Sequence, residues 1–149
     1  MKEWEILHQI RRLDALYRRE KHKKKQILYP EDKNTGGYGR ILSALSEKKE
    51  GVSQKELAET LGIRPQSLTD ALENLEREDL IERKRSETDK RQVMVKITKE
   101  GLKAEKHDKE LRHEVSRIIF DCLTKSEKQV LMDILNKVNS QTEDREEDA

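Results

Sequence analysis

The chain offers little material for covalent, metal or membrane chemistry: its 149 residues include one cysteine, four histidines and no long apolar stretch. A single cysteine excludes an internal disulfide framework. Because no segment has the apolar length of a signal peptide or a membrane span, we expect a cytoplasmic protein without a membrane partner. The scattered histidines lack zinc-finger spacing, so no metal site is indicated. No nucleophile–base arrangement, phosphate-binding glycine loop or paired-carboxylate motif occurs, so we expect no catalytic residues, no enzyme activity and no cofactor.

Proline and aromatic residues are also scarce, with two prolines and 3% aromatic residues, whereas 42% of the chain is charged. Glu, Lys, Leu, Arg and Ala dominate the composition, and these residues favour helices. The 32% of hydrophobic residues leaves little material for a large monomeric core. This shortage favours apolar surfaces that a partner chain completes; the alternative is one small core with long solvated helices.

The formal net charge of +1 conceals an uneven distribution of charge. Residues 1–30 carry nine Lys/Arg against four Asp/Glu, and residues 83–99 carry seven against two. Residues 141–149 carry one against five. Because salt screens charges separated by more than about 8–10 Å, these local patches matter more than the total. The chain therefore has two basic patches and an acidic tail.

Two short amphipathic helices separated by Gly62 are predicted between Ser53 and residue 78. Ser53 and Glu56 form a capping-box pattern at the start of the first helix. Gly62 supplies the permissive backbone that a sharp helix–helix turn needs, and Pro65 suits the first turn of the second helix. Leucines at i, i+4 and i+7 are expected to face the first helix: Leu68, Leu72 and Leu75.

A β-hairpin with a long charged loop follows this helix pair. Leu80 and Ile81 begin one strand, and the alternating residues Val93, Val95 and Ile97 indicate its partner. The loop between them reads Arg85-Ser86-Glu87-Thr88-Asp89-Lys90-Arg91. It is longer than a tight hairpin requires, and such loops are usually functional. A helix pair followed by a basic hairpin has the shape of a winged helix-turn-helix, which indicates binding to double-stranded DNA.

Further helices are predicted at residues 3–25, 38–49, 99–123 and 125–141. The stretch 103–114 is almost wholly polar, which is typical of a helix that bridges two lobes. Thr124 and Glu127 form a second capping-box pattern. Residues 142–149 are acidic and lack apolar anchors, so we expect them to be disordered.

The order and spacing of these features resemble the MarR family of dimeric winged-helix transcription regulators. The resemblance is specific from Arg40 to Gly101. It includes Leu57-Ala58 with Leu61-Gly62-Ile63, Leu68-Thr69 with Leu72 and Leu75-Glu76, and Asp79-Leu80-Ile81-Glu82-Arg83. The wing pattern of the family, Asp-x-Arg and then Val-x-x-Thr-x-x-Gly, is matched by Asp89, Arg91, Val95, Thr98 and Gly101.

The resemblance implies a mainly α fold with a small β-hairpin wing, in which a winged helix-turn-helix accompanies a helical dimerisation region. The expected parts are an N-terminal dimerisation helix and loop (1–37), a DNA-binding domain (38–101), connecting and dimerisation helices (102–141) and a disordered acidic tail (142–149). The apolar residues expected in the homodimer interface are Trp4, Leu7, Ile10, Leu13, Ile118, Ile119, Leu131, Ile134, Leu135 and Val138. Packing of these residues into a core of the single chain is the alternative.

The resemblance also implies that residues 65–78 enter the major groove of DNA and that the wing reaches the adjacent minor groove. The residues expected to contact DNA are Ser53, Arg64, Gln66, Ser67, Thr69, Asn74, Lys84, Arg85, Asp89, Lys90 and Arg91. Gln66 and Asn74 suit base edges, and Arg91 suits a narrow, electronegative minor groove. Asp89 is expected to hold Arg91 in place. Asp70 and Asn74 stand where the family commonly has basic residues, so we expect affinity to depend on the wing more than usual.

The expected function is that of a sequence-specific, ligand-responsive repressor that binds an inverted-repeat operator as a homodimer. A winged-helix module that binds another protein, without sequence-specific DNA binding, is the alternative. The effector is an unidentified small molecule, and Tyr17, Tyr29, Tyr38 and His8 are pocket candidates that core or loop packing explains equally well. Cys122 lies among apolar residues and is expected to be buried rather than redox-sensing. His107 and His113 are expected to be solvated rather than metal ligands.

Overall fold

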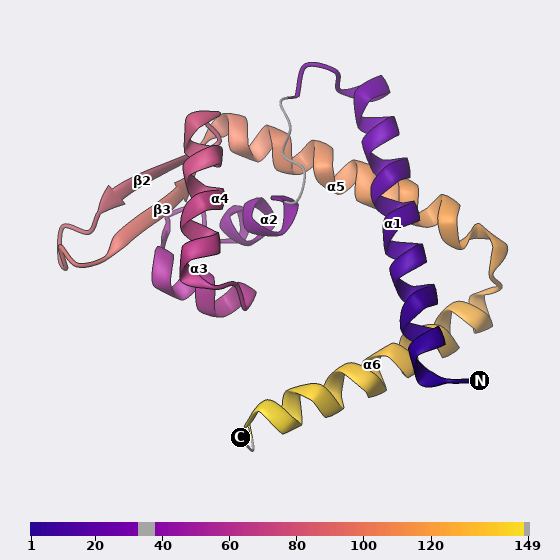
Figure 1. Ribbon diagram of the computed structural model, residues 1–149. Coiled ribbons are helices and arrows are strands. Elements are labelled where there is room, and N and C mark those ends of the chain that lie inside the picture. Colours follow the sequence, from indigo (N-terminus) through magenta and orange to yellow (C-terminus); the bar gives the residue numbers. More distant parts are fainter. Residues whose placement is uncertain (33–37, 148–149) are drawn as a thin grey trace. The chain divides into compact units, whose positions relative to one another are not determined.

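The computed structural model describes residues 1–32 and 38–147, and it describes side chains as far as residue 141 (Figure 1). Residues 33–37, the end of the predicted N-terminal loop, lie outside the described residues. The chain divides into two compact units, residues 1–113 and residues 114–149. The first unit holds α1 (Glu3–Leu28), α2 (Gly39–Glu47), β1 (Val52–Ser53), α3 (Gln54–Leu61), α4 (Pro65–Arg77), β2 (Ile81–Arg85) and β3 (Val93–Ile97). Helix α5 (Lys99–Ile119) begins in the first unit and ends in the second. The predicted mainly α fold with a small wing is confirmed.

Helices α3 and α4 form at their predicted capping residues, but the Glu56 carboxylate bonds Lys48 and does not complete the predicted capping box with Ser53. Ser53 is the N-cap of α3, and its hydroxyl accepts a hydrogen bond from the backbone N–H of Glu56 at 3.1 Å. The Glu56 carboxylate accepts a hydrogen bond from Lys48 Nζ at 2.8 Å, and this bond raises the pKa of Lys48. Gly62 ends α3 with φ 63° and ψ 32°, the left-handed conformation that glycine adopts without steric cost. Pro65 occupies the first turn of α4, where a missing backbone N–H costs nothing.

The sheet has three antiparallel strands in the order β1-β3-β2. In the hairpin, Ile81 pairs with Ile97 and Arg85 pairs with Val93. Strand β1 was not predicted, because two residues are too few to show an alternating pattern. It adds a strand to the other edge of β3 through the pairing of Val52 with Val95. The strand directly precedes α3, so it fixes the start of the helix pair on the sheet.

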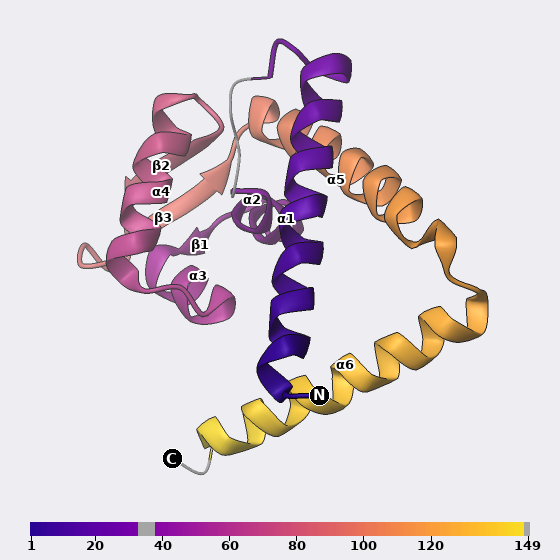
Figure 2. The same cartoon turned by 45° about the vertical axis from the view of Figure 1, so that its right-hand side comes forward.

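The core of the first unit lies between this sheet and helices α2 to α4 (Figures 1 and 2). The leucine triad of α4 is fully buried, as predicted. It packs in one cluster with residues from the other elements: Ile41, Leu42, Leu45, Val52, Leu57, Ala58, Leu80, Ile81, Val95, Ile97 and Ala104. Each large apolar side chain in such a cluster contributes roughly 1.5–3 kcal/mol through removal from water. This cluster fixes the orientation of α4 relative to the wing.

Helix α5 is anchored to the base of the hairpin by Thr98. The Thr98 hydroxyl donates to the backbone carbonyl of Asp79 at 2.7 Å and accepts from the backbone N–H of Gly101 at 3.0 Å. The polar stretch 103–114 belongs to a helix that runs from one compact unit into the other, as predicted, but it also has a buried face. Ala104, Asp108 and Leu111 lie at helical spacing and are all buried in the single chain. The sequence did not show this face, because an aspartate occupies the position between Ala104 and Leu111.

Asp108 belongs to a polar cluster in the first unit that joins the end of α1 to α5. Its carboxylate accepts from Lys21 Nζ at 2.5 Å and from Arg112 Nη1 at 3.4 Å. Burial lowers the pKa of the Lys25 ammonium, and the nearby carboxylates of Asp32 and Asp108 partly offset this decrease. An aspartate can occupy this buried position because two cations compensate its charge.

Tyr29 and His107 add an aromatic stack to this cluster. The two rings lie 3.8 Å apart between centroids with an interplanar angle of 9°. His107 Nδ1 is 2.6 Å from Asp32 Oδ2, and the Tyr29 hydroxyl donates to Glu110 Oε2 at 2.5 Å. The prediction of a solvated His107 is therefore wrong, because local spacing on α5 carries no information about Tyr29 and Asp32, which follow α1 and contact its ring. Among the described residues, no group of His, Cys, Asp and Glu side chains has an arrangement suited to a metal ion.

The second unit contains the end of α5, a 3₁₀ turn (Phe120–Cys122) and α6 (Lys125–Glu147). The predicted helix to residue 123 therefore ends at Ile119, where the 3₁₀ turn begins. The second capping box is confirmed: Thr124 Oγ1 accepts from the Glu127 N–H at 3.1 Å, and Glu127 Oε2 accepts from the Thr124 N–H at 3.0 Å. Cys122 is exposed on this turn, so the prediction of a buried cysteine is wrong. Its apolar neighbours in sequence do not cover it, because the turn ends the helical face that they share.

Helix α6 also corrects the prediction of a disordered tail from residue 142. The helix continues to Glu147, and residues 148–149 lie outside the described residues. Gln, Glu and Arg are good helix formers, and each added residue extends an existing helix at little entropic cost. Composition alone therefore underestimated how far a well-capped helix propagates. None of the helices, over the residues described, combines the length and the apolar character needed to cross a membrane.

Candidate nucleic-acid interface

The outward face of α4 is polar and exposed, as predicted from the inward leucines. It presents Gln66, Ser67, Asp70, Glu73 and Arg77. These side chains lie on a helix whose buried face is fixed by the core, so their positions relative to the wing are defined. In a helix-turn-helix, the N-terminal residues of the second helix contact base edges in the major groove. The face can donate and accept hydrogen bonds, but it carries two carboxylates and one guanidinium.

Arg64 occupies the N-cap of α4 with extended backbone (φ −61°, ψ 138°) and provides no side-chain cap. Its side chain is exposed. The first turn of a helix presents free N–H groups, so a cation is unfavourable there and an anion such as phosphate is favoured. The guanidinium of Arg64 therefore stays accessible for the DNA contact that the sequence predicts.

Thr69 is held in place by Gln54, a residue that the sequence did not single out. The Thr69 hydroxyl accepts from Gln54 Nε2 at 2.7 Å and donates to the backbone carbonyl of Pro65 at 3.0 Å. This bond crosslinks the first turn of α3 to the second turn of α4. Thr69 is half-buried, so it orients the recognition helix as well as lining its surface.

Asn74 does not join the exposed face, in contrast to its predicted contact with bases. Its Nδ2 donates to the Tyr38 hydroxyl at 2.9 Å, and its Oδ1 accepts from Arg77 Nη1 at 3.0 Å. Both ends of the amide are thus used within the chain. The residue is half-buried and ties α4 to the start of α2. This contact also places Tyr38 as a packing residue.

The wing loop is an ordered turn organised by Ser86. The Ser86 hydroxyl accepts from the backbone N–H groups of Thr88 at 3.3 Å and Asp89 at 3.2 Å. Backbone bonds from Ser86 to the Gln92 carbonyl (2.9 Å) and from Gln92 to the Asp89 carbonyl (3.0 Å) close the turn. The Arg85 guanidinium adds a bond to the Lys90 carbonyl at 2.9 Å. Arg85 therefore stabilises the turn through this bond, in addition to the DNA contact predicted for it.

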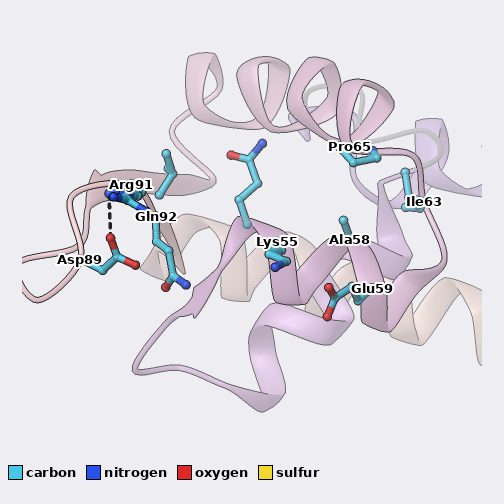
Figure 3. Close-up of a pocket in the computed structure, with 10 residues that line it drawn as sticks. Lys55, Ala58, Glu59, Ile63, Pro65, Asp89, Arg91 and Gln92 are labelled. Atoms are coloured by element: carbon cyan, nitrogen blue, oxygen red, sulfur yellow. Dashed lines mark hydrogen bonds between the residues drawn. The ribbon is translucent and has the colours of Figure 1, made fainter.

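Asp89 holds Arg91 through the backbone rather than through an ion pair. Asp89 Oδ1 accepts from the backbone N–H of Arg91 at 3.0 Å, the bond drawn in Figure 3. The Arg91 side chain is exposed, as are Lys84 and Lys90. Because Asp89 fixes the backbone and not the guanidinium, the charge of Arg91 remains available to a partner.

A groove of about 660 Å³ lies between the helix pair and the wing (Figure 3). Lys55, Ala58 and Glu59 line it from α3, and Asp89 and Arg91 line it from the wing. Gln54, Ile63, Pro65, Gln92 and Val93 complete its lining. The structure thus brings the wing tip and the start of the recognition helix to one surface. Lys55 was missed by sequence reasoning, although its position roughly opposite the inward Leu57 on α3 is a usable signal of exposure.

A helix pair with an exposed polar recognition face, set beside an ordered basic hairpin, defines a winged helix-turn-helix protein. The comparisons with known proteins agree with this class. The model of the MarR family matches residues 35–92. The HTH-type transcriptional regulator BilQ from Clostridium symbiosum is 32% identical over 96 residues, which cover 64% of this chain and 67% of BilQ. The uncharacterized HTH-type transcriptional regulator YwhA from Bacillus subtilis is 31% identical over 84 residues, 56% of this chain and 60% of YwhA. The chain belongs to the MarR family of transcription regulators.

Solved structures show the same fold over most of the chain. A mutant of MarR from E. coli, complexed with operator DNA, superposes with a TM-score of 0.72 and 23% identity over 90% of this chain and 91% of MarR. PcaV from Streptomyces coelicolor, in complex with its natural ligand, gives 0.71 and 21% over 89% and 90%. A putative MarR-like transcription regulator from Bacillus cereus gives 0.74 and 23% over 92% and 95%. The resemblance found in the sequence from Arg40 to Gly101 is confirmed, and the fold extends beyond that region.

Proposed function

We propose that this protein is a homodimeric repressor that binds an inverted-repeat operator in double-stranded DNA and releases it in response to a small-molecule effector. The observation that carries the proposal is the exposed recognition face of α4 beside the exposed guanidinium of Arg91 on an ordered wing. A MarR structure of the same fold is complexed with operator DNA, which supports the same use of this surface.

In this proposal, α4 lies in the major groove and the wing reaches the adjacent minor groove. Gln66 and Ser67 are the residues of α4 that are positioned for base edges. Arg91 enters the minor groove, whose negative potential favours an arginine. Phosphates are contacted by the predicted basic groups whose side chains are exposed: Arg64, Lys84, Arg85 and Lys90. Ser53 is half-buried and caps α3, so it contributes through the position of that helix. Asn74 contributes to this interface only through the position of α4.

The homodimer is proposed from the apolar faces of α1 and α6. Trp4 and Leu7 on α1 are 61% and 56% exposed in the single chain, and Val138 on α6 is 58% exposed. Ile10, Leu13, Ile118, Ile134 and Leu135 are also exposed, and Ile119 and Leu131 are half-buried. Large apolar side chains exposed along one helix mark interaction sites when they are grouped together. The segments 1–37 and 102–141 are therefore proposed to contribute the dimer interface.

Replacing Ile134 and Val138 together with glutamate is expected to raise the dimer dissociation constant by about 100-fold or more, because apolar burial is lost in both subunits. Light scattering coupled to size-exclusion chromatography measures the change. The matched control is the double variant Asn136→Glu with Ser140→Glu, which places the same two charges at the same spacing on exposed polar positions of α6. Far-UV circular dichroism reports whether α6 stays helical. A double variant that dimerises like the control would contradict the proposed interface.

An effector is proposed because PcaV, with the same fold, has been solved with its natural ligand. Of the pocket candidates, Tyr29 stacks on His107 and bonds Glu110, so its side chain is already used within the chain. The chemistry of the effector is left to a screen of small anions and phenols for compounds that shift the melting temperature. A hit that also lowers DNA affinity identifies the effector.

The proposed function is tested by incubating the purified protein with fragmented genomic DNA and sequencing the bound fraction. We expect enrichment of fragments that contain an inverted repeat with half-sites about one helical turn apart. Transcription in vitro from the enriched promoter should fall when the protein is added. Enrichment of no fragment, even at low salt, would instead favour the alternative of a protein-interaction module.

A further inference from the structure

The recognition helix carries a carboxylate where affinity for a polyanion would favour a neutral or basic residue. Asp70 lies in the second turn of α4, on the exposed face that the proposed function places against base edges. Nearby phosphates repel its charge, so the residue lowers affinity for every DNA sequence by the same electrostatic effect. Within the described part of the chain, no salt bridge to Asp70 offsets that cost. A compensating contact with DNA would give the carboxylate a function.

Gln66 orients this carboxylate. Gln66 Nε2 donates to Asp70 Oδ1 at 3.1 Å across one turn of the helix. The bond occupies one amide hydrogen of Gln66 and leaves the other amide hydrogen, the amide oxygen and the carboxylate oxygens of two exposed side chains. The pair therefore presents more acceptors than donors.

The major-groove edges of the four bases respond differently to such a surface. Guanine presents two acceptors and thymine presents an acceptor with a methyl group, so both are unfavourable opposite a carboxylate. Adenine presents an amino donor beside the N7 acceptor, which repels the second carboxylate oxygen. Cytosine presents its N4 amino group without an adjacent acceptor. Of the four bases, cytosine is the best partner for Asp70.

We propose that Asp70, oriented by Gln66, is a specificity-determining residue that accepts a hydrogen bond from the N4 amino group of one cytosine in each operator half-site. This inference rests on the proposed function, because it assigns a base to the recognition face of α4. The charge weakens binding to all DNA, and the cytosine contact restores part of that affinity at the operator only. Asp70 thereby increases the ratio of specific to non-specific binding.

The experiment is selection from a random double-stranded DNA library with four full-length proteins: the wild type, Asp70→Ala, Asp70→Asn and the control Glu47→Gln. Glu47 is an exposed carboxylate at the end of α2, outside the recognition face, so its substitution removes the same charge at a different place. We expect the wild type and Glu47→Gln to require cytosine at one position of each half-site. Asp70→Ala should lose about tenfold of discrimination at that position alone and should bind random DNA several-fold more tightly.

Asp70→Asn gives the sharpest outcome, because an amide pairs with the N6 and N7 groups of adenine. It should change the preferred base at that position from cytosine to adenine while the other positions keep their preferences. A wild type that selects an inverted repeat without this cytosine, or an Asp70→Ala variant that keeps the cytosine preference, would overturn the inference and leave the proposed function intact. A wild type that selects no sequence would overturn both.

Discussion

Arg91→Ala is expected to lower the affinity for operator DNA by about thirtyfold or more. A single arginine contact with DNA contributes about 1–3 kcal/mol, and the proposed homodimer would present two wings. The effect is large because α4 cannot replace the lost charge: the carboxylates of Asp70 and Glu73 lie on its exposed face. The turn that carries Arg91 is held by Ser86 and Asp89, so truncation of the guanidinium leaves the wing in place.

The measurement is a fluorescence-anisotropy titration with an operator duplex at two or more salt concentrations. Lys96→Ala is the matched control, because Lys96 is an exposed cation on the same hairpin whose cross-strand neighbour is Glu82. We expect this control to change affinity by less than about threefold, since its charge is already offset by the neighbour. Equal affinities for wild type and Arg91→Ala would exclude the proposed role of the wing.

The parts of the fold that were predicted correctly are those that local chemistry specifies. The leucine triad of α4 follows from helical spacing, and the turn at Gly62 follows from the conformational freedom of glycine. The wing could be located because alternating residues on β3 are bounded by a polar loop. Each of these signals lies within one element or between two neighbours in the chain.

The errors concern contacts between residues that are distant in sequence. Asn74 has the side chain of a base-reading residue, but Tyr38, 36 positions earlier, uses its amide. His107 looked solvated on its own helix, whereas Asp32 lies 75 positions earlier and contacts its ring. Spacing along a helix shows which residues share a face, but it does not show which other element covers that face. The candidate site was therefore predicted in outline, and the availability of each side chain required the structure.

The glycine at the end of the wing motif, Gly101, provides a test of why the family pattern contains it. A Cβ atom at this position would lie 2.0 Å from the carbonyl oxygen of Leu80 and 2.7 Å from Ile97 Cγ1. The first of these atoms belongs to the backbone, so no change of side-chain rotamer can relieve the overlap. The backbone itself is held by Thr98, whose N–H donates to the same Leu80 oxygen at 3.1 Å. The glycine is thus required by the close approach of α5 to the start of β2.

Gly101→Ala is therefore expected to destabilise the protein by about 3 kcal/mol or more, the upper end of what overpacking costs. Helix propensity alone would predict that Gly101→Ala increases the free energy of unfolding, because alanine in the interior of a helix is favoured over glycine by roughly 1 kcal/mol. Two control variants separate the causes. In Gly62→Ala the added Cβ meets no atom within 4 Å, so this variant has only the strain of the left-handed backbone, about 1 kcal/mol. Lys103→Ala changes an exposed residue of α5 and introduces neither overlap nor strain.

Urea unfolding at one fixed protein concentration gives the comparison, because the stability of a dimer depends on concentration. The free energy of unfolding should decrease in the order Lys103→Ala, Gly62→Ala, Gly101→Ala. If Gly101→Ala were as stable as Lys103→Ala, α5 and the start of β2 would have to be farther apart than the 2.0 Å between a Cβ atom at position 101 and the Leu80 oxygen implies. A loss that is clearly larger for Gly101→Ala than for Gly62→Ala would instead show that this contact fixes the base of the hairpin, and hence the position from which Arg91 is proposed to reach DNA.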